Sequence, residues 1–309
     1  MNALDTFDLP DFDPKLTRRA VRRGLLRTVV IVLAVLALLA VAVTEGSRLV
    51  QTRGDRERRM MAVLGTAFKM YNPGYVVTNG TCCETAPASM SFEVTTRPMG
   101  PSRAWPAGGQ TYTISQSFFG RVGRLPLGHT ANTRLSQSLF DVGTDLGAKE
   151  RVRQVLARLP GDLNALAVVE FERPLGETEL KRFVRGHGSC AGRVVYERRP
   201  GALPITWGHD YWSDATDLGE GRDVSEEACE GSLKGFRSWV GLLRDHDDAN
   251  LRSFDLSLKR LREAARAGLA HAYVDNLSSV RNLRELLKDP RVRTIRLAEV
   301  AFDLDSPHP

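Results

Sequence analysis

The chain has 309 residues, of which 42% are hydrophobic and 26% charged, a composition typical of a globular protein long enough to bury a substantial core. The formal net charge is +6, but no zinc-finger spacing, helix-turn-helix signal or aromatic-basic stripe accompanies it, which argues against direct binding of nucleic acid. The sequence also has no glycine-rich phosphate-binding loop, no HExxH pair and no paired carboxylates on one helix face, so we expect no catalysis, no cofactor and no metal.

Residues 1–14 alternate acidic and apolar side chains, and two prolines among them prevent a continuous helix. Such a pattern is typical of short disordered segments that dock on a basic, grooved partner surface, although a solvated tail is the plainer interpretation. The whole basic arm of residues 1–27 is too short to fold alone. The residues that we expect to contact a partner are Asp5, Phe7, Asp8, Leu9 and Phe12.

Residues 28–44 form an apolar run that carries no charge and consists almost entirely of Val, Leu, Ile and Ala. As a helix, the run would be roughly 25 Å long, close to the ~30 Å hydrocarbon thickness of a bilayer. We therefore predict a transmembrane helix whose partner is membrane lipid. Two alternatives are a cleaved secretory signal, for which Ala40-Val41-Ala42 supplies a cleavage pattern, and a buried core helix.

Basic residues are distributed unequally across this run. Residues 15–27 contain six Lys or Arg and no acidic residue, whereas residues 45–60 mix five Arg with three acidic residues. The positive-inside rule counts Lys and Arg close to the span. We therefore expect a single-pass protein of the cell membrane with a cytoplasmic N-terminus and an extracytoplasmic body. The basic cluster also suits anionic lipid headgroups.

Beyond the predicted span, the sequence pattern changes twice. Residues 45–74 carry apolar side chains at helical spacing and predict a juxtamembrane helix that ends at Asn72-Pro73-Gly74, with Gly54 as a candidate break. Residues 75–160 then predict a β-rich part. Its expected elements are strands at 75–78, 90–96 and 111–118 and a helix at 147–159.

Residues 161–309 alternate strands and helices. The expected order is a buried strand at 166–171, a helix from Gly176 and a strand at 193–197, then a strand at 271–275, a helix at 278–288 and a strand at 292–302. Two such units predict a split βαβ, ferredoxin-like layer, and the whole chain is expected to be an α+β protein. Residues 200–270 are expected to form an insertion with helices at 236–243 and 251–267.

All four cysteines lie beyond the predicted span, as expected for disulfides in an oxidising compartment. Cys82 and Cys83 are adjacent, and because adjacent cysteines seldom bridge each other we expect each to pair elsewhere, or Cys190 and Cys229 to pair alone. A Cys190–Cys229 bridge would close a loop of about 38 residues and contribute roughly 4 kcal/mol in the chain-entropy model. Buried free thiols are the alternative.

One cluster of acidic, basic and aromatic residues, in the 205–214 loop, is a candidate ligand or glycan cleft. An ordered surface loop is the plainer alternative. The residues that would line the cleft are Trp207, His209, Asp210, Tyr211 and Trp212.

The segment Gly188–Gly192 has the outline of a nucleophile elbow with Cys190 in the place of serine. It follows a predicted helix and precedes a predicted strand, whereas an elbow joins a strand to a helix, so half of a disulfide is the better interpretation. His187 and Cys190 have a zinc-like spacing, but no second pair lies near them in the sequence, which argues against zinc.

Three segments carry a resemblance to a known family. They are Val168–Leu175 with Glu179-Leu180 behind it, the closing strand-helix-strand from Ala272 to Val300, and the basic patch from Lys15 that runs into apolar residues up to Val43. In these segments the chain resembles the bacterial sigma-factor regulator family, membrane-anchored proteins regarded as anti-sigma factors. The resemblance implies a membrane anchor, an extracytoplasmic sensor domain, and a sigma factor or another membrane regulator as partner of residues 1–27. Family members that act directly on a sigma factor carry a longer cytoplasmic segment than this one.

Two functions are therefore expected. The first is a single-pass membrane regulator whose extracytoplasmic domain senses a condition or binds a partner and so controls transcription across the membrane. The alternative is a membrane-anchored extracytoplasmic protein that binds cell-wall or envelope ligands through the 205–214 loop and has no transcriptional role. An envelope hydrolase that uses Cys190 or His209 is the least favoured reading of the sequence.

Overall fold

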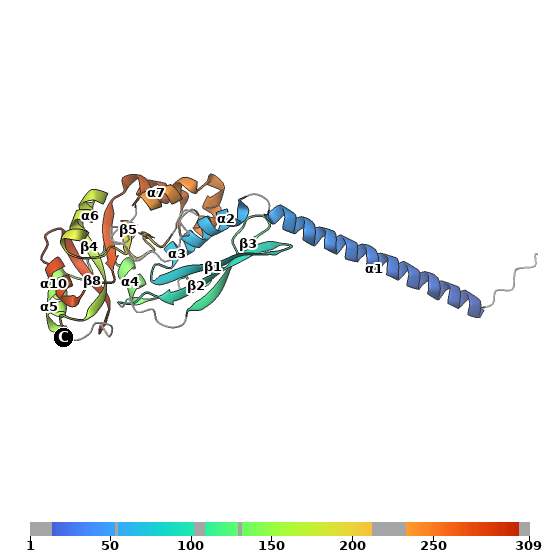
Figure 1. The fold of residues 1–309 in the computed structure, drawn as a ribbon, viewed down its shortest axis with the longest axis horizontal. Coiled ribbons are helices and arrows are strands. Elements are labelled where there is room, and N and C mark those ends of the chain that lie inside the picture. The colour runs from blue at the N-terminus through green and yellow to red at the C-terminus, as the bar shows by residue number, and fades with distance from the viewer. Residues whose placement is uncertain (1–13, 53–54, 102–108, 129–131, 212–232, 303–309) are drawn as a thin grey trace, which may run out of the picture.

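The structure is a computed structural model that describes residues 14–52, 55–101, 109–128, 132–211 and 233–302. Within these ranges the chain is an α+β protein with one long N-terminal helix and two antiparallel sheets. The long helix projects from the folded body, and the three-stranded sheet lies between this helix and the five-stranded sheet (Figure 1).

Helix α1 spans Pro14–Thr52, and its 39 residues give it a length of about 58 Å. The body leaves its apolar stretch uncovered, because the large side chains from Val29 to Val43 are 45–70% exposed. The helix is long and apolar enough to cross a membrane, and none of its most apolar window is buried, so the alternative of a core helix is wrong. The predicted limits 28 and 44 bound the apolar stretch but not the helix, which continues in both directions.

Three short helical segments follow α1, and we call them together the axis segment, residues 56–71. They are α2 (Arg56–Met60), the π-helical turn η1 (Met61–Gly65) and α3 (Thr66–Tyr71). Leu64 and Phe68 are buried at the helical spacing that the sequence predicted. The predicted end near Asn72 is confirmed, but α1 supplies the first part of the expected juxtamembrane helix; Gly54 lies outside the described residues.

The first sheet has the strand order β1-β2-β3. Its strands are β1 (Tyr75–Ala86), β2 (Ser89–Pro98) and β3 (Gln110–Ser117). Alternate residues of β2, including Phe92 and Val94, are buried in the same cluster as the axis segment, so the sheet lays one face on that helix. The three predicted strands are confirmed. Strands β1 and β2 are longer than expected, because pairing continues through their polar Thr and Ser residues, and β3 is shifted by one residue from its predicted limits.

The second sheet has five strands in the order β6-β5-β7-β4-β8, and each neighbouring pair is antiparallel. The strands are β4 (Asn164–Leu175), β5 (Arg193–Glu197), β6 (Ile205–Gly208), β7 (Ala270–Asp275) and β8 (Val292–Ala301). Strand β4 is buried on both faces, as its apolar sequence predicted. The edge strand β6 was not predicted, since four residues are too few to show an alternating pattern.

Helices cover both faces of the second sheet. On one face, α6 (Glu177–Gly186) and α10 (Val280–Leu286) bring Phe183 and Leu283 into the cluster that contains Val169 of β4. On the other face, α4 (Arg134–Phe140) packs Leu139 against Val168. The expected helix at 147–159 is α5 (Lys149–Arg158), which contacts α10 and β8.

The insertion between β6 and β7 contains a cap of short helices. They are α7 (Leu233–Leu242), the 3-10 turn η5 (Asp245–Asp247), α8 (Asp248–Arg252) and α9 (Leu258–Ala267). The single helix predicted at 251–267 is wrong. Asp255 has a φ of +53°, which interrupts the helical backbone, and the Ser257 hydroxyl then caps α9 by accepting a hydrogen bond from the Arg260 N–H.

Candidate functional site

Polar contacts hold the axis segment on the side of the first sheet and on the side of the insertion. Arg56 donates a hydrogen bond of 2.8 Å to the carbonyl of Ser117, at the end of β3. The Arg59 guanidinium pairs with the carboxylate of Asp247, whose side chain is only 8% exposed. Both arginines lie on α2, so the first turns after α1 are fixed to two separate parts of the body.

The middle of the axis segment is fixed by a tryptophan from the insertion. The indole N–H of Trp239 on α7 donates a hydrogen bond of 2.7 Å to the carbonyl of Ala62 in the π-helical turn. Trp239 is fully buried and its ring lies 5.7 Å from that of Trp207 on β6. This aromatic pair therefore connects the axis segment to the edge of the second sheet.

The last turns of the axis segment reach the chain just after β6. The Thr66 hydroxyl donates a hydrogen bond of 3.2 Å to the carbonyl of Tyr211, and the Lys69 ammonium donates to the carbonyl of Asp210. Lys69 is only 8% exposed. Burial lowers the pKa of Lys69, and the nearby Asp210 carboxylate partly opposes this shift.

A buried arginine completes this junction. Arg193 on β5 is 1% exposed and donates to the carbonyls of Pro73 and Tyr75, immediately after the axis segment. Its guanidinium carbon lies 5.1 Å above the ring of Tyr211. Five N–H donors in a planar fork allow an arginine to satisfy several carbonyls at once, which explains how this charge is tolerated inside the core.

The predicted ligand cleft is wrong for two of its five candidate residues. Trp207 and Tyr211 are each 1% exposed and belong to the main hydrophobic core, where their rings pack edge to face at 5.7 Å. His209 is exposed and Asp210 half-exposed. Trp212 lies outside the described residues. The aromatic residues of this loop are therefore anchors of the junction just described.

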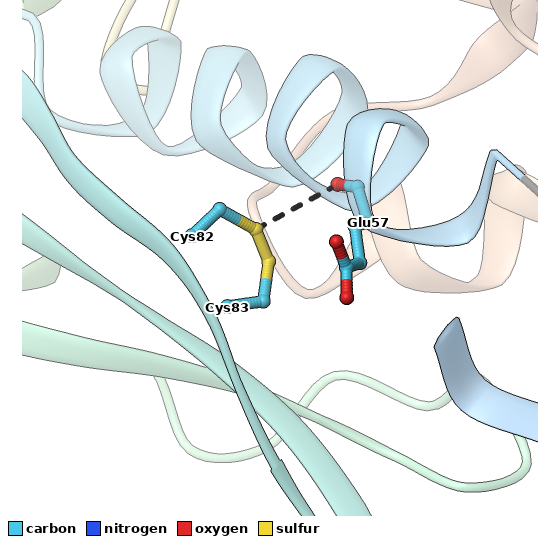
Figure 2. Close-up of a disulfide and its surroundings, with 3 residues drawn as sticks. All are labelled: Glu57, Cys82 and Cys83. Atoms are coloured by element: carbon cyan, nitrogen blue, oxygen red, sulfur yellow. Dashed lines mark hydrogen bonds between the residues drawn. A yellow bond between two sulfur atoms is a disulfide. The ribbon is translucent and has the colours of Figure 1, made fainter. Parts of the chain in front are cut away.

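The structure joins Cys82 to Cys83 in a disulfide between adjacent residues of β1, and both sulfur atoms face α2 (Figure 2). The expectation that each cysteine pairs elsewhere is wrong. The register between β1 and β2 shifts on both sides of Cys82. The sulfur of Cys82 lies 3.9 Å from the carbonyl oxygen of Glu57, and Cys82 is exposed while Cys83 is half-buried.

Cys190 is also in a disulfide and is buried. Its predicted partner, Cys229, lies outside the described residues, so that pairing stays a prediction. His187 does not join Cys190, because its Nε2 atom lies 3.4 Å from the Asp289 carboxylate. The partner-binding candidates of the arm, Asp5, Phe7, Asp8, Leu9 and Phe12, lie outside the described residues as well.

A buried carboxylate lies beside the segment that resembled a nucleophile elbow. Asp275, at the end of β7, accepts hydrogen bonds from the hydroxyls of Ser189 and Ser278 and from the backbone N–H groups of Leu277 and Ser278. Burial raises the pKa of Asp275, and these four hydrogen bonds oppose the shift. The Ser189 hydroxyl also lies 2.8 Å from the hydroxyl of Tyr273, so it belongs to a closed structural network.

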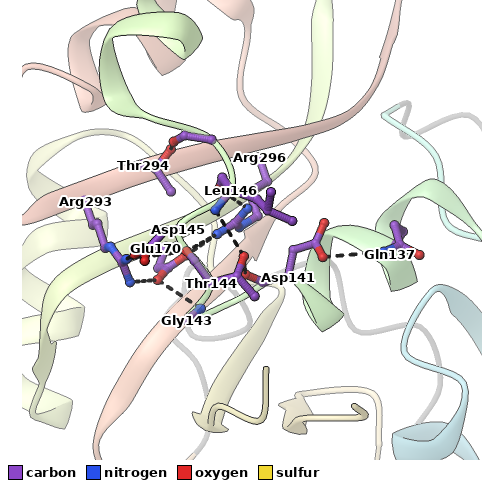
Figure 3. Close-up of polar contacts among 11 residues, drawn as sticks. Gln137, Asp141, Gly143, Thr144, Asp145, Leu146, Glu170, Arg293, Thr294 and Arg296 are labelled. Carbon is purple, nitrogen blue, oxygen red and sulfur yellow. Dashed lines mark hydrogen bonds and ion pairs between the residues drawn. The ribbon is translucent and has the colours of Figure 1, made fainter. Parts of the chain in front are cut away.

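A second buried carboxylate ties β4 to β8 and to the loop after α4 (Figure 3). Glu170 is paired with Arg293 at 2.9 Å and with Arg296 at 3.0 Å, and it accepts the backbone N–H of Gly143. The side chain of Glu170 is 2% exposed. Arg293 extends the network outward to Asp145 at 2.8 Å. The cluster therefore anchors the 143–146 loop to the edge of the second sheet.

Among the described residues, no three His, Cys, Asp or Glu side chains are placed to hold a metal ion. Comparison with family models, curated proteins and solved structures finds no match for this chain.

Sequence reasoning missed the buried charges of the junction and of the second sheet. For Glu170 a signal was present, because an acidic residue interrupts the apolar run of β4 and such a charge needs a partner. For Lys69 and Arg193 no local signal existed. Their partners are more than a hundred positions away, on segments whose approach only the fold determines.

Replacing Glu170 by glutamine should lower the free energy of unfolding by about 3–5 kcal/mol, because the change leaves two arginines without their buried counter-charge. Urea unfolding of the full chain in detergent micelles measures the difference. The matched control is Glu150→Gln, which removes an exposed pair with Arg153 and should cost less than ~1 kcal/mol. Equal effects of the two substitutions would contradict the proposed role of the buried network.

Disulfide mapping should find Cys82 and Cys83 within one peptide that resists alkylation until a reductant is added, because the two thiols are joined to each other. Mass spectrometry of a non-reduced digest makes the measurement. Cys190 should be found linked to the peptide that contains Cys229. A peptide of Cys82 or Cys83 cross-linked to either of these cysteines would contradict both statements.

The stability of the protein should depend on the ionisation of Asp275. Its pKa is raised in the folded state, so the folded protein holds this proton over a pH range where the unfolded chain has lost it. This range lies above the ordinary aspartate pKa and below the raised one. Within it, Asp275 makes the free energy of unfolding fall with rising pH, by at most about 1.4 kcal/mol per pH unit. Asp275→Asn should remove this contribution, which denaturant titrations across the acidic range measure; parallel curves for the two proteins would refute it.

Proposed function

We propose that this chain is a single-pass membrane regulatory protein with a cytoplasmic arm and an extracytoplasmic body. The observation that carries the proposal is the uncovered apolar surface of α1. Eleven Val, Leu and Ile side chains between residues 29 and 43 are 45–70% exposed. At about 1.5 kcal/mol for each side chain, removing them from water is worth more than about 15 kcal/mol, which no contact within the described body supplies.

The orientation rests on charge. Residues 15–27 carry six basic and no acidic residues, and they belong to the same helix as the apolar stretch. The opposite flank is of mixed sign. The positive-inside rule therefore puts the arm in the cytoplasm and the two sheets outside, and an oxidising compartment outside suits the two disulfide-bonded sites of the body.

The second sheet supports the sensor part of the proposal. Helix α6 connects β4 to β5 across β7, and α10 connects β7 to β8 across β4. This connectivity supports our proposal of a split βαβ, ferredoxin-like layer extended by β6. The sigma-factor regulator resemblance covers this same part of the chain. We assign the body the role of binding an envelope ligand or partner.

The axis segment gives the body a direct connection to the membrane helix. It follows α1 in the chain, and its residues are bonded to the first sheet, the insertion and the loop after β6. A ligand that shifts the population of body conformations would therefore act on α1 through packed contacts. The effector would be residues 1–27, as in an anti-sigma factor or an accessory to one. The alternative function is that of an anchored envelope-binding protein without a transcriptional role. The same membrane helix and the same body would suit this function.

Two fusions test the topology. A reporter that is active only outside the cytoplasm should be active when fused after Pro309 and inactive when fused before Met1, and N-terminal sequencing should recover the arm on the mature protein. Activity of the reporter at Met1, or a mature chain that begins at Val43, would overturn the proposal.

The transcriptional role is tested by the full-length chain purified in mild detergent. We expect a sigma factor or another membrane regulator to co-purify, and to be lost when residues 1–14 are deleted. The matched control keeps the composition of these residues but scrambles their order, so that the charge of the arm is unchanged. Transcription that responds identically in all three proteins would reject the regulatory role in favour of the alternative.

A further inference from the structure

The turn between β1 and β2 is bonded to the last turns of α1. The Ser47 hydroxyl donates a hydrogen bond to the carbonyl of Pro87, and the Gln51 side-chain amide donates one of 2.8 Å to the carbonyl of Ala86. Gln51 is fully buried by this contact. The end of the first sheet that carries this turn therefore has a fixed height along the helix (Figure 1).

A second turn, residues 117–122, lies beside the first and is held from several sides. The backbone N–H of Phe118 donates to the carbonyl of Ala88 at 2.7 Å. Arg56 donates to the carbonyl of Ser117, and the Asn250 side chain bonds both to the carbonyl of Gly120 and to the N–H of Val122. Such a turn is ordered by the body around it and holds its side chains in place.

Phe119 projects from this second turn into solvent. It is 86% exposed, more than any other large hydrophobic residue of the described chain. The ring of Phe118 packs edge-on against it, with 5.6 Å between the ring centres. A rigid turn that exposes an aromatic ring is an arrangement that a partner surface of low polarity would stabilise.

The position of the β1–β2 turn along α1, to which the second turn is bonded through Phe118 and Ala88, points to such a surface. Ser47 lies three residues beyond Thr44, the end of the apolar run, which corresponds to about 4.5 Å along the helix. The headgroup layer on each side of the hydrocarbon is about 5–8 Å thick, so the turn bonded to Ser47 lies at the height of the headgroups. Of the charged residues at this end, Arg48 and Arg121 are exposed cations, and Glu45 and Glu84 are exposed acids.

We propose that the 117–122 turn is a membrane-contact site, in which Phe119 inserts into the interface of the bilayer that α1 spans and Arg121 faces lipid phosphate. The inference rests on the proposed membrane span. The turn would be a second attachment to the bilayer besides α1. Two attachments would fix the orientation of the first sheet relative to the membrane. Aromatic side chains bind at this depth because their rings leave water while nearby cations meet anionic headgroups.

Site-directed spin labelling of the full chain in liposomes of phosphatidylcholine and phosphatidylglycerol tests the proposal. The label is attached at Phe119→Cys, and its collision rates with oxygen and with a water-soluble nickel chelate are compared. The first reference is Thr111→Cys, an exposed site on the same β3 about 20 Å from Ser117. The second reference is Leu36→Cys, in the middle of the apolar run; the unsubstituted chain, labelled without reductant, gives the background.

We expect the nickel chelate to reach residue 119 several-fold less than residue 111, while oxygen reaches it more. Equal accessibility at residues 119 and 111, with residue 36 shielded, overturns the membrane-contact site and leaves the span in place. Free access of the chelate to residue 36 overturns the span itself, and with it the proposed function. Because Phe119 is exposed and outside the core, its replacement does not remove packing on which folding depends.

Discussion

The burial of residues 56–71 between two sheets and a helical cap is the constraint on which the rest of the molecule depends. Three residues separate the segment from the end of α1 in the chain, and it contributes Leu64 and Phe68 to the main core. The first sheet has three strands and buries one face, and the second sheet is covered by other elements on both faces. The main core therefore takes side chains from both sheets and from the segment between them. The body is therefore assembled around the helical segment that comes after α1, and the hydrogen bonds of Ser47 and Gln51 tie the end of α1 to the β1–β2 turn of that body.

Buried charges occur where the parts of this assembly meet. Lys69 and Arg193 lie at the junction of the axis segment with the second sheet, and Glu170 lies where β4 meets β8 and the loop after α4. Each is compensated by backbone carbonyls or by opposite charge. Pairs of this kind add little net stability compared with apolar residues of similar size, but they are costly to break. A shifted placement of the parts in this protein would leave a buried charge unpaired.

Much of the secondary structure could be predicted from the sequence, because local patterns determine it. The strand at 193–197 was predicted to the residue, and the apolar spacing around Leu283 predicted its helix. The errors have local or long-range causes. The interruption of the predicted 251–267 helix at Asp255 depends on one residue in an unusual backbone conformation. Strand β6 is too short for an alternating pattern to be visible. The contacts of the candidate site were out of reach, because the two partners of the Arg59–Asp247 pair are 188 positions apart. For the loop of Trp207 and Tyr211 the sequence suggested a candidate cleft or, more plainly, an ordered surface loop; it did not indicate burial, because aromatic residues suit a cleft and a core equally well.

The π-helical turn Met61–Gly65 determines how α2 is rotated about the helix axis relative to α3. A π turn accommodates one residue more than an α turn, so α2 is rotated about the helix axis relative to where a regular helix would put it. In a regular helix one residue corresponds to about 100°. Arg56 and Arg59 reach their separate partners only at the present phase, and a chain with one residue fewer in this turn would direct both guanidinium groups away from them. The extra residue of the π turn therefore gives α2 the rotation at which Arg56 and Arg59 meet their partners.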